Sequence, residues 1–394
     1  MFCGVAPALA AGPSLAAVLR ASLQGWRPSL PKEHWRILNA LLACRTPALG
    51  GHRYRCLECA RTHFVPHSCR NRHCPLCQGQ AARQWLAQQE AALLPVPYFH
   101  LVFTLPHTLN PLIQQNQRAL YTLLFRAASQ TLLEFAQNRF QAQLGITAVL
   151  HTWSQTLLDH YHLHCIVSGG GLSEDGSRWV RASPNFLFAV RALAAVFRGK
   201  FCSGLQALHA DGQLEFHARL QSLGDAKAFQ RLLRQAVRHK WTVYAKRPFA
   251  GPRQVLAYLS RYTHRVALSP SRLLALDEHQ PTVSFAWKDY AQGAQRKTMT
   301  LPLKEFLRRF CLHLLPERFV KIRHFGLLSN AQRQRCLAQA RALLRQTAVP
   351  VTTAPTTVRS GPICPHCGSP FLVLVQIIAP VVMGSAPKPA LDSS

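Results

Sequence analysis

Two histidines, His162 and His164, flank a single apolar residue, and their spacing is the strongest indication of chemistry in the chain. In an extended strand, alternate side chains point to the same face. Both imidazoles would therefore project together, while Leu163 between them would point into a core. Two imidazoles on one face of a strand make half of a metal site, so the segment predicts a bound divalent metal.

A metal site of this kind needs a third protein ligand, and we favour Gln155. It lies seven residues before His162, across a predicted hairpin from which its amide can reach back to the imidazoles. Three other side chains compete for the position: Asp159, His151 and His160. A divalent metal held in this way would bind a phosphate oxygen, offset its charge and orient the phosphorus for in-line attack.

Two tyrosines four residues apart, Tyr258 and Tyr262, are the candidate nucleophiles. If the segment is helical, their phenols lie on one face. The pKa of a phenol is about 10, but a nearby metal and basic side chains stabilise the phenolate, so that it can attack a phosphodiester. The product would be a covalent phosphotyrosine, which retains the bond energy for rejoining the strand. Arg261 and Arg265 are candidate ligands for the neighbouring phosphates.

The charge of the chain indicates the substrate. Among 394 residues, 46 are Lys or Arg and 16 are Asp or Glu, which gives a formal net charge of +30. The stretch from Ala226 to Leu276 has eleven Lys or Arg residues and no acid. A field of one sign this large is typical of a protein that binds a polyanion, most simply DNA or RNA. Separately, the histidine and tyrosine pairs would more often be packing features; together, in so basic a chain, they indicate cutting and rejoining of nucleic acid.

Paired cysteines indicate a structural zinc module. Cys56 and Cys59 form one Cys-x-x-Cys knuckle, Cys74 and Cys77 form another, and fourteen residues separate the two knuckles. Tetrahedral zinc is bound by four thiolate or imidazole ligands, and a knuckle turn presents two sulfurs at a suitable angle. We therefore predict that these four cysteines bind one zinc ion.

The same stretch offers further ligands and a basic surface. Four side chains form a candidate second zinc site, with core packing or DNA contact as the alternative: Cys44, His52, Cys69 and His73. Arg70 and Arg72 lie in an acid-free part of the module, and we predict that they contact DNA phosphates. A single further knuckle, Cys364 with Cys367, has no obvious second pair in the sequence; Cys336 or His324 would complete it, and the alternative is a degenerate remnant that binds no metal.

The elements that must position these residues follow from periodicity. Tyr98–Leu105 is predicted to be a strand, and two more strands, Thr147–Trp153 and His162–Val167, are predicted to form the hairpin with the histidines. The segment from Gly251 to His264, which carries the tyrosines, is predicted to be a helix with proline in its first turn. We divide the chain into a helical and zinc-binding docking domain (1–95), a catalytic domain (96–330) and a C-terminal segment (331–394), which comprises a helix, a Thr/Pro linker and the last knuckle.

Several of these motifs resemble the HUH rolling-circle transposases of bacterial insertion sequences, the IS91 family. Leu150-His-Thr-Trp-Ser-Gln155 followed by His162-Leu-His164 resembles the metal motif of the family, and Tyr258-Leu-Ser-Arg-Tyr-Thr-His-Arg265 resembles its tyrosine helix. The cysteine-rich stretch 44–78 resembles its N-terminal zinc-binding domain, and the stretch 306–330 resembles a later block. Tyr161 departs from the proline expected before the first histidine.

This resemblance implies an α+β fold: an antiparallel, ferredoxin-like HUH sheet flanked by helices and preceded by a small zinc-binding domain. It also implies cleavage of single-stranded DNA through a 5′-phosphotyrosine, with Mg²⁺ or Mn²⁺ as the catalytic cofactor beside structural Zn²⁺. The two tyrosines match the two-tyrosine type of the family.

We therefore predict a DNA transposase that nicks and joins single strands at the ends of its element and at its target, in the bacterial cytoplasm and associated with the nucleoid. No segment is long and apolar enough to predict a membrane span, and the oligomeric state is left open. A plasmid or phage replication initiator or a relaxase would use the same chemistry. A third alternative is an inactive, zinc-dependent DNA-binding protein.

Overall fold

The computed structural model describes residues 12–26, 28–238, 241–246, 254, 256, 267–344 and 363–380. Its largest sheet has the strand order β11-β4-β5-β3-β7, and a short strand, β6, pairs with β5. The bounds of these strands are β3 Tyr98–Thr104, β4 Ala142–Trp153, β5 Asp159–Ser173, β6 Trp179–Arg181, β7 Thr242–Lys246 and β11 Ile322–Gly326. Every pairing in the sheet is antiparallel.

The connections of this sheet make it ferredoxin-like. Between β3 and β4 the chain forms two helices, α4 and α5, and between β5 and β7 it forms α6 and α7. The bounds of the helices are α4 Asn110–Gln115, α5 Gln117–Phe140, α6 Val190–Ala210 and α7 Ala226–Arg238. Strands β3, β4, β5 and β7 thus follow the βαββαβ order, with β5 inserted between β3 and β4, and the predicted fold class is confirmed.

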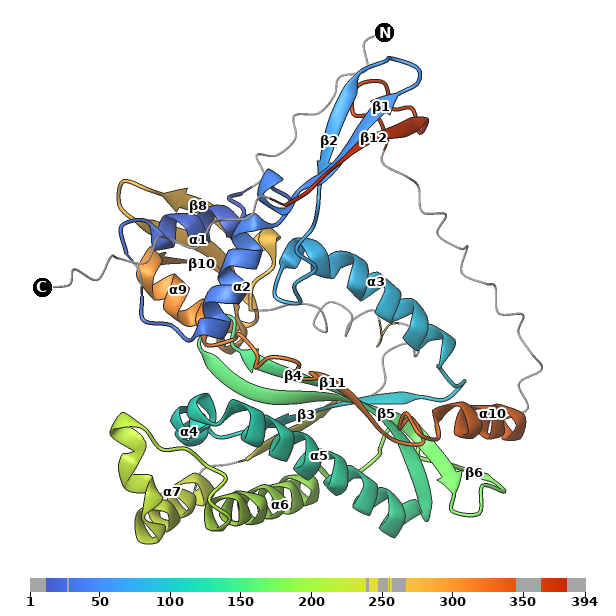
Figure 1. The fold of residues 1–394 in the computed structure, drawn as a ribbon. Coiled ribbons are helices and arrows are strands. Elements are labelled where there is room, and N and C mark those ends of the chain that lie inside the picture. The colour runs from blue at the N-terminus through green and yellow to red at the C-terminus, as the bar shows by residue number, and fades with distance from the viewer. Residues whose placement is uncertain are drawn as a thin grey trace, which may run out of the picture.

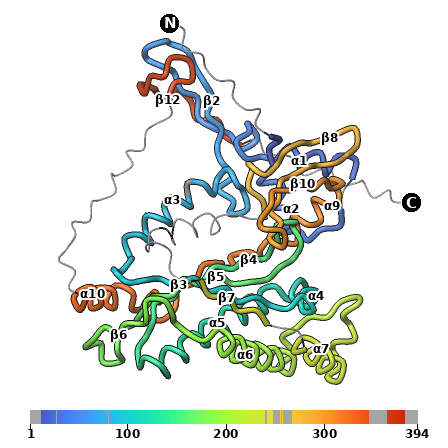
Figure 2. Tube along the Cα trace, turned by 180° about the vertical axis from the view of Figure 1, so that it is seen from behind, coloured from blue at the N-terminus to red at the C-terminus, as the bar shows by residue number. Residues whose placement is uncertain are grey.

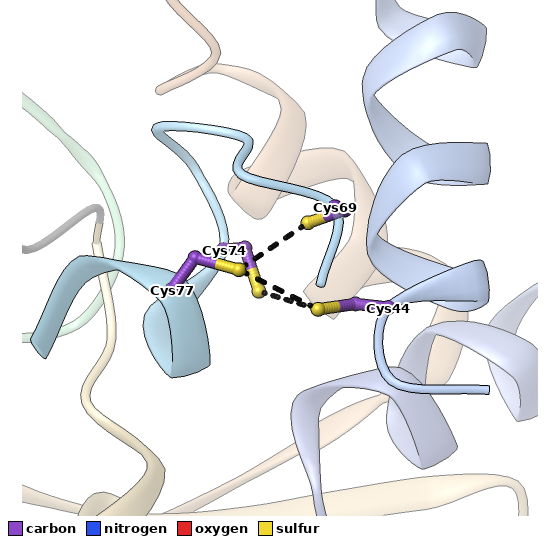
Figure 3. A group of neighbouring side chains, drawn as sticks. All are labelled: Cys44, Cys69, Cys74 and Cys77. Carbon is purple, nitrogen blue, oxygen red and sulfur yellow. Dashed lines mark hydrogen bonds between the residues drawn. The ribbon is translucent and has the colours of Figure 1, made fainter. Parts of the chain in front are cut away.

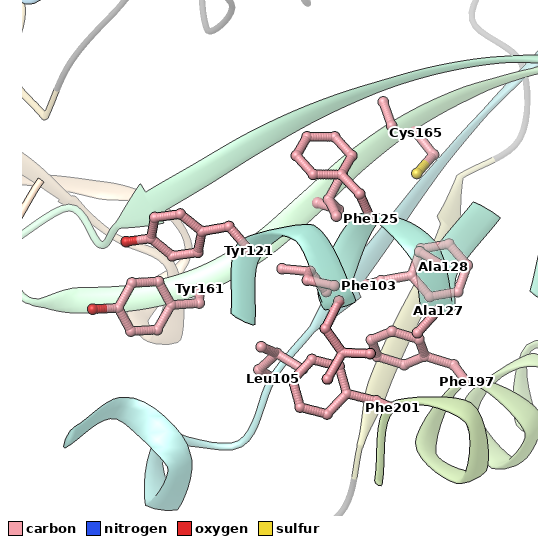
Figure 4. Close-up of a cluster of buried hydrophobic side chains, with 14 of the residues drawn as sticks. Phe103, Leu105, Tyr121, Phe125, Ala127, Ala128, Tyr161, Cys165, Phe197 and Phe201 are labelled. Carbon is pink, nitrogen blue, oxygen red and sulfur yellow. The ribbon is translucent and has the colours of Figure 1, made fainter. Parts of the chain in front are cut away.

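Strand alternation gives the sheet two different faces. Figure 1 shows α4, α5, α6 and α7 together on one side of the sheet. Tyr161 and Cys165 of β5 point to that side, into a cluster with Phe103 and Phe125 (Figure 4). Leu163, between them on the strand, is completely buried in the same cluster. Because neighbours along a strand point in opposite directions, His162 and His164, which alternate with these residues, lie on the other face.

A second body lies on the side of that other face, at the end of the sheet where β4 turns into β5 (Figure 1), and it is built from both halves of the chain. Helices α1 (Leu15–Leu23), α2 (Lys32–Ala43) and α9 (Leu303–Cys311) pack with a three-stranded sheet of order β10-β9-β8. Its strands are β8 Leu273–Asp277, β9 Thr282–Asp289 and β10 Gln295–Pro302. Leu157, in the turn between β4 and β5, is completely buried in the same hydrophobic cluster.

Segments from the N-terminal and C-terminal parts of the chain pair in a narrow arm. Strand β12 (Leu372–Ile378) pairs antiparallel with β1 (Gly51–Cys56), which also pairs with β2 (Thr62–Pro66), and Figures 1 and 2 show this ribbon projecting from the rest of the molecule. Helix α3 (Pro75–Ala91) leads from the arm to β3, and its Trp85 packs in a third cluster with residues of α10 (Arg333–Leu343).

Packing does not follow the predicted segment boundaries at residues 95 and 330, and the three-part division stays a prediction. The second body joins the first fifty residues to residues around 300, and β12 joins the C-terminal segment to the N-terminal module. Short 3₁₀ turns connect the elements at Pro47–Leu49, His107–Leu109, Ala218–Gly224, Pro270–Arg272 and Tyr290–Gln292. Among the described helices, none has the length and apolar character needed to cross a membrane.

Candidate metal centre and cysteine clusters

Three histidines converge on the face of the sheet opposite α5 and α6. The register of the β4–β5 hairpin places His151 directly opposite His162, and His164 follows two residues later on the same face. One ring nitrogen from each imidazole lies within 4.8 Å of the others. The Nε2 atoms of His162 and His164 are 3.1 Å apart. All three side chains are at least 91% buried, since their exposed fractions are 3%, 9% and 8%.

Hydrogen bonds fix how two of these rings are presented. The Nδ1–H of His162 donates to the backbone carbonyl of His160 at 2.8 Å, which leaves its Nε2 lone pair free to bind a cation. On the other ring, Nδ1 of His164 lies 2.8 Å from Nε2 of His100, a buried histidine of β3. If His164 donates in this contact, its Nε2 lone pair also points into the cluster.

The nitrogen spacing fits a metal ion. With metal–nitrogen bonds of about 2.1 Å, two ligands at tetrahedral or right angles are about 3.0–3.4 Å apart, and the His162–His164 spacing lies in that range. Metals bind the neutral imidazole. Burial lowers the pKa of His162 to about 3 and that of His164 well below its usual value, with neighbouring histidines adding to the effect at His164. The rings are therefore neutral and available as ligands near pH 7.

His151, one of the competitors named from the sequence, lies beside the two histidines, whereas Gln155 is not part of the cluster. Gln155 lies in the turn beyond the last strand pair, Trp153 with Asp159, and its backbone carbonyl accepts a hydrogen bond from Arg272. The other competitors are also engaged elsewhere. The carboxylate of Asp159 accepts a hydrogen bond from Gln114 at 2.8 Å, and the ring of His160 stacks on that of His107. Gln155 as a ligand stays a prediction that this geometry does not favour.

The candidate nucleophiles and their neighbours lie outside the described residues. This applies to both tyrosines and to both adjacent arginines of the predicted helix: Tyr258, Tyr262, Arg261 and Arg265. Their roles rest on the sequence, and the histidine cluster is the part of the predicted catalytic site that the structure describes.

Four cysteines meet where α2 ends and α3 begins (Figure 3). Cys44 follows the last residue of α2, Cys74 immediately precedes α3, and Cys77 lies in the first turn of α3. The sulfurs are 3.5 Å apart between Cys44 and Cys74, 3.6 Å between Cys44 and Cys77, and 3.7 Å between Cys69 and Cys77. Tetrahedral zinc with bonds of about 2.3 Å separates its sulfur ligands by about 3.8 Å, so this cluster fits a zinc ion.

The predicted pairing of the knuckles is different in the structure. Cys74 and Cys77 do not meet Cys56 and Cys59 but complete the cluster with Cys44 and Cys69. Cys56 and Cys59 instead meet Cys364 and Cys367, which belong to the C-terminal knuckle. The reason is local: β1 and β2 carry the first knuckle away along the arm, while the second knuckle is held at the start of α3.

The two histidines proposed for a second zinc site have other partners. The Nε2 of His73 accepts the backbone N–H of Leu315 at 3.0 Å, and burial lowers the pKa of this histidine to about 3. The Nε2 of His52 lies 3.4 Å from Nε2 of His67. Cys44 and Cys69 therefore do not form a separate site with His52 and His73; they lie in one cluster with the two α3 cysteines.

The two arginines of the module differ in exposure. Arg70 is exposed, with a positive φ of 50°, and is available to a ligand in solution. Arg72 is half-buried, and its guanidinium donates to the backbone carbonyls of Phe319 and Pro316. Arg72 therefore ties the cysteine module to the segment before β11, so the DNA contact predicted for it would compete with this role.

Fold and clusters together define an α+β protein with a candidate metal centre on one face of a ferredoxin-like sheet and a cysteine-rich N-terminal module. Two family models match the chain: a transposase zinc-binding domain over residues 18–105 and a transposase model, described as putative, over residues 145–335. A putative transposase of Sinorhizobium fredii is 43% identical over 383 residues, which cover 93% of this chain and 96% of the relative. The transposase of insertion sequence element IS801 from Pseudomonas savastanoi pv. phaseolicola is 32% identical, with 74% and 69% covered.

The chain therefore belongs to the IS91-type family of insertion-sequence transposases with an N-terminal zinc-binding domain. It is an enzyme family that acts on DNA, and the zinc-binding domain implies structural Zn²⁺. Among solved structures, the metal-bound conjugative relaxase TrwC in complex with OriT DNA matches 64% of this chain and 96% of its own. Its sequence identity is 14% and its TM-score 0.26, which is too low to bear on function.

Proposed function

We propose that this transposase nicks and joins single-stranded DNA through a 5′-phosphotyrosine, with a divalent metal held by His151, His162 and His164. The observation that carries the proposal is the convergence of the three imidazoles within 4.8 Å on one face of the sheet. Mg²⁺ or Mn²⁺, when bound, would neutralise charge on the scissile phosphate and orient it.

The chain's own residues would carry the covalent step. The phenolate oxygen of Tyr258 or Tyr262 attacks the phosphorus, a phosphorus–oxygen bond to the tyrosine forms, and the bond to the 3′ oxygen breaks. The phenol loses its proton and the departing oxygen gains one, so the products are a 5′-phosphotyrosine and a free 3′ hydroxyl. Two tyrosines allow two successive transfers, and attack by a 3′ hydroxyl on the phosphotyrosine reseals a strand without another energy source.

One described helix has the charge pattern expected of a DNA-binding surface. Helix α7 contains no acid, and its basic side chains recur every three or four residues, all of them exposed: Lys227, Arg231, Arg234 and Arg238. The opposite side of the helix, with Phe229 and Leu233, is buried. Residues at this spacing share a helix face, so α7 presents a basic stripe that fits the spaced phosphates of a nucleic acid strand.

The test is formation of a covalent adduct with DNA. The full-length protein is incubated with Mn²⁺ and labelled single-stranded DNA that carries the element's terminal sequences, and a shifted, protease-sensitive band is scored on a denaturing gel. We expect an adduct with the natural protein and none with Tyr258→Phe/Tyr262→Phe. Tyr244→Phe is the matched control, because Tyr244 is an exposed tyrosine of β7 and has no place in the mechanism.

Two results would overturn the proposal. An undiminished adduct in the double tyrosine variant would exclude both phenols as nucleophiles. Full cleavage by a His162→Ala/His164→Ala variant, with Mn²⁺ as the metal, would remove the metal centre from the reaction.

A further inference from the structure

The arm formed by β1, β2 and β12 has almost no hydrophobic interior. None of the residues in these three fully described strands belongs to the hydrophobic clusters of the molecule. Strand β12 has no buried residue, and four of its apolar side chains are 45–66% exposed: Val373, Leu374, Val375 and Ile377. A small sheet of this kind is marginal in water unless something else stabilises it.

Four sulfurs gather at one end of the arm. Cys56 lies 3.5 Å from Cys367, and Cys59 lies 3.6 Å from Cys364; all four sulfurs are within 4.8 Å of one another. These distances match the sulfur–sulfur distances in the cluster of Cys44, Cys69, Cys74 and Cys77. They are also close to the spacing of about 3.8 Å expected for sulfurs around zinc. The cysteines that face each other are 311 and 305 residues apart in the chain.

The two knuckles have the same backbone shape. In each of them the residue after the second cysteine has a positive φ, 57° at Ala60 and 76° at Gly368. Each first cysteine is also tied back across its turn, because the N–H of Cys56 donates to Arg61 and that of Cys364 donates to Ser369, both at 2.9 Å. An alanine in this conformation is unfavourable unless its surroundings demand it, which indicates that the turn is shaped to present sulfurs.

Further contacts join the knuckles and the strands behind them. The N–H of Leu57 donates to the carbonyl of Phe371 at 3.0 Å, between the first knuckle and the start of β12. Arg61 donates to Nδ1 of His366 at 3.2 Å, and Arg53 donates to Gln376 at 2.9 Å. One end of the three-stranded sheet thus carries two knuckles, one from the N-terminal module and one from the C-terminal segment.

We propose that Cys56, Cys59, Cys364 and Cys367 bind a second structural zinc ion, which makes the arm a zinc ribbon shared between the N-terminal module and the C-terminal segment. The matching zinc-binding family model ends at residue 105 and does not include the C-terminal knuckle. The C-terminal segment is then an integral part of the N-terminal module, and the zinc ion holds it there. The proposal does not depend on the nicking chemistry.

Zinc content of full-length variants tests the proposal. The natural protein, Cys364→Ser/Cys367→Ser, Cys56→Ser/Cys59→Ser and the quadruple variant are purified with zinc, and zinc per chain is counted by native mass spectrometry. We expect each double variant to lose one zinc ion and the quadruple variant to lose the same single ion. Cys202→Ala/Cys336→Ala, which changes two cysteines outside the clusters, is expected to lose none.

The outcomes separate this site from the sequence-based pairing. If Cys56 and Cys59 shared a zinc ion with Cys74 and Cys77, replacing Cys364 and Cys367 would remove no zinc, and the proposal would be wrong. If the quadruple variant lost two zinc ions while each double variant lost one, the two knuckles would bind different ions, and the proposal of one shared site would also be wrong. Because native mass spectra also report the charge states of folded chains, a variant that loses zinc only by global unfolding is recognised.

A second measurement follows the C-terminal segment itself. A protease site is inserted between residues 345 and 362, and the cut protein is passed through a size-exclusion column. We expect the C-terminal fragment to co-elute with the body while zinc is bound, and to separate after a chelator is added or in the Cys56→Ser/Cys59→Ser background. Separation of the fragment from fully zinc-loaded protein would contradict the proposal.

Discussion

Replacing His151 provides the sharpest test of the metal centre, because the sequence and the structure favour different third ligands. His151 faces His162 across the hairpin, whereas Gln155 lies in the turn. We expect His151→Asn to weaken binding of Mn²⁺ strongly and Gln155→Ala to leave it unchanged. Asparagine keeps a polar side chain of moderate size, so the buried site is not simply emptied.

The size of the effect can be bounded. Loss of a partner that only orients a metal ligand lowers metal affinity roughly 10–100-fold. Loss of one of three protein ligands should cost at least the upper end of that range, about 100-fold, which corresponds to about 2.8 kcal/mol of binding free energy. Isothermal titration with Mn²⁺ measures the affinity directly, and the absorption spectrum of Co²⁺-loaded protein reports a change in the ligand set without any assay of DNA cleavage.

A control for folding makes the result decisive. Thermal melts of the metal-free variants show whether His151→Asn has damaged the fold, since His151 also stacks on Trp153 with ring centroids 4.7 Å apart. Full Mn²⁺ affinity in a folded His151→Asn protein would refute the three-histidine assignment. A loss in Gln155→Ala as large as that in His151→Asn would return Gln155 to the ligand set.

Three further predictions concern the sheet, acid stability and DNA binding. His100→Ala removes the partner of Nδ1 of His164, and Mn²⁺ affinity is expected to fall roughly 10–100-fold while the melting curve stays cooperative; unchanged affinity would show that the 2.8 Å contact does not orient the ligand. Burial lowers the pKa of His313 to about 4, whereas its pKa in the unfolded chain is about 6.5. Between these two values the unfolded chain binds more protons, so the free energy of unfolding decreases as the pH is lowered, by up to about 1.4 kcal/mol per pH unit. Denaturant titrations at several pH values should therefore show that the unfolding free energy of His313→Gln decreases less on acidification than that of the natural protein. An equal decrease in both proteins would contradict a low pKa for His313. Affinity for single-stranded DNA is expected to fall roughly 300-fold or more between 50 and 200 mM salt if six or more phosphates are contacted, whereas a flat response would exclude phosphate tracking.

The sequence was enough to predict those parts of the site that depend on a single strand. Alternation along β5 was enough to place His162 and His164 together and Leu163 in the core, and both expectations are confirmed by the register and the burial of these residues. The ferredoxin-like sheet was accessible for a different reason, through resemblance to a family. By contrast, His100 lay in a predicted strand, but pairing of β3 with β5 had to be known before its contact with His164 could be seen.

The cysteines show where proximity in sequence misleads. Fourteen residues between two knuckles suggested one site, and the knuckle more than 300 residues away had no evident partner. Closing a long loop costs little more than closing a medium one, because the entropy grows only with the logarithm of its length. The backbone pairing between β1 and β12 therefore brings the C-terminal knuckle beside Cys56 and Cys59, and no local sequence pattern predicts that pairing.

The sequence left the third metal ligand open between Gln155 and three competitors, because the choice depends on how the turn between β4 and β5 is held. The turn from Ser154 to Leu158 is held by the second body: Leu157 is completely buried there with a positive φ of 63°, and its carbonyl accepts the Nε2–H of His313 at 3.0 Å. Arg309 of α9 donates to the carbonyl of Thr156 at 2.9 Å. A change of register by one residue would move every side chain of a strand to the opposite face, and these contacts to the turn support the register in which His151 lies opposite His162. The candidate metal centre is thus supported by contacts between this turn and residues 153 and 156 positions further along the chain, which no pattern within the hairpin itself reveals.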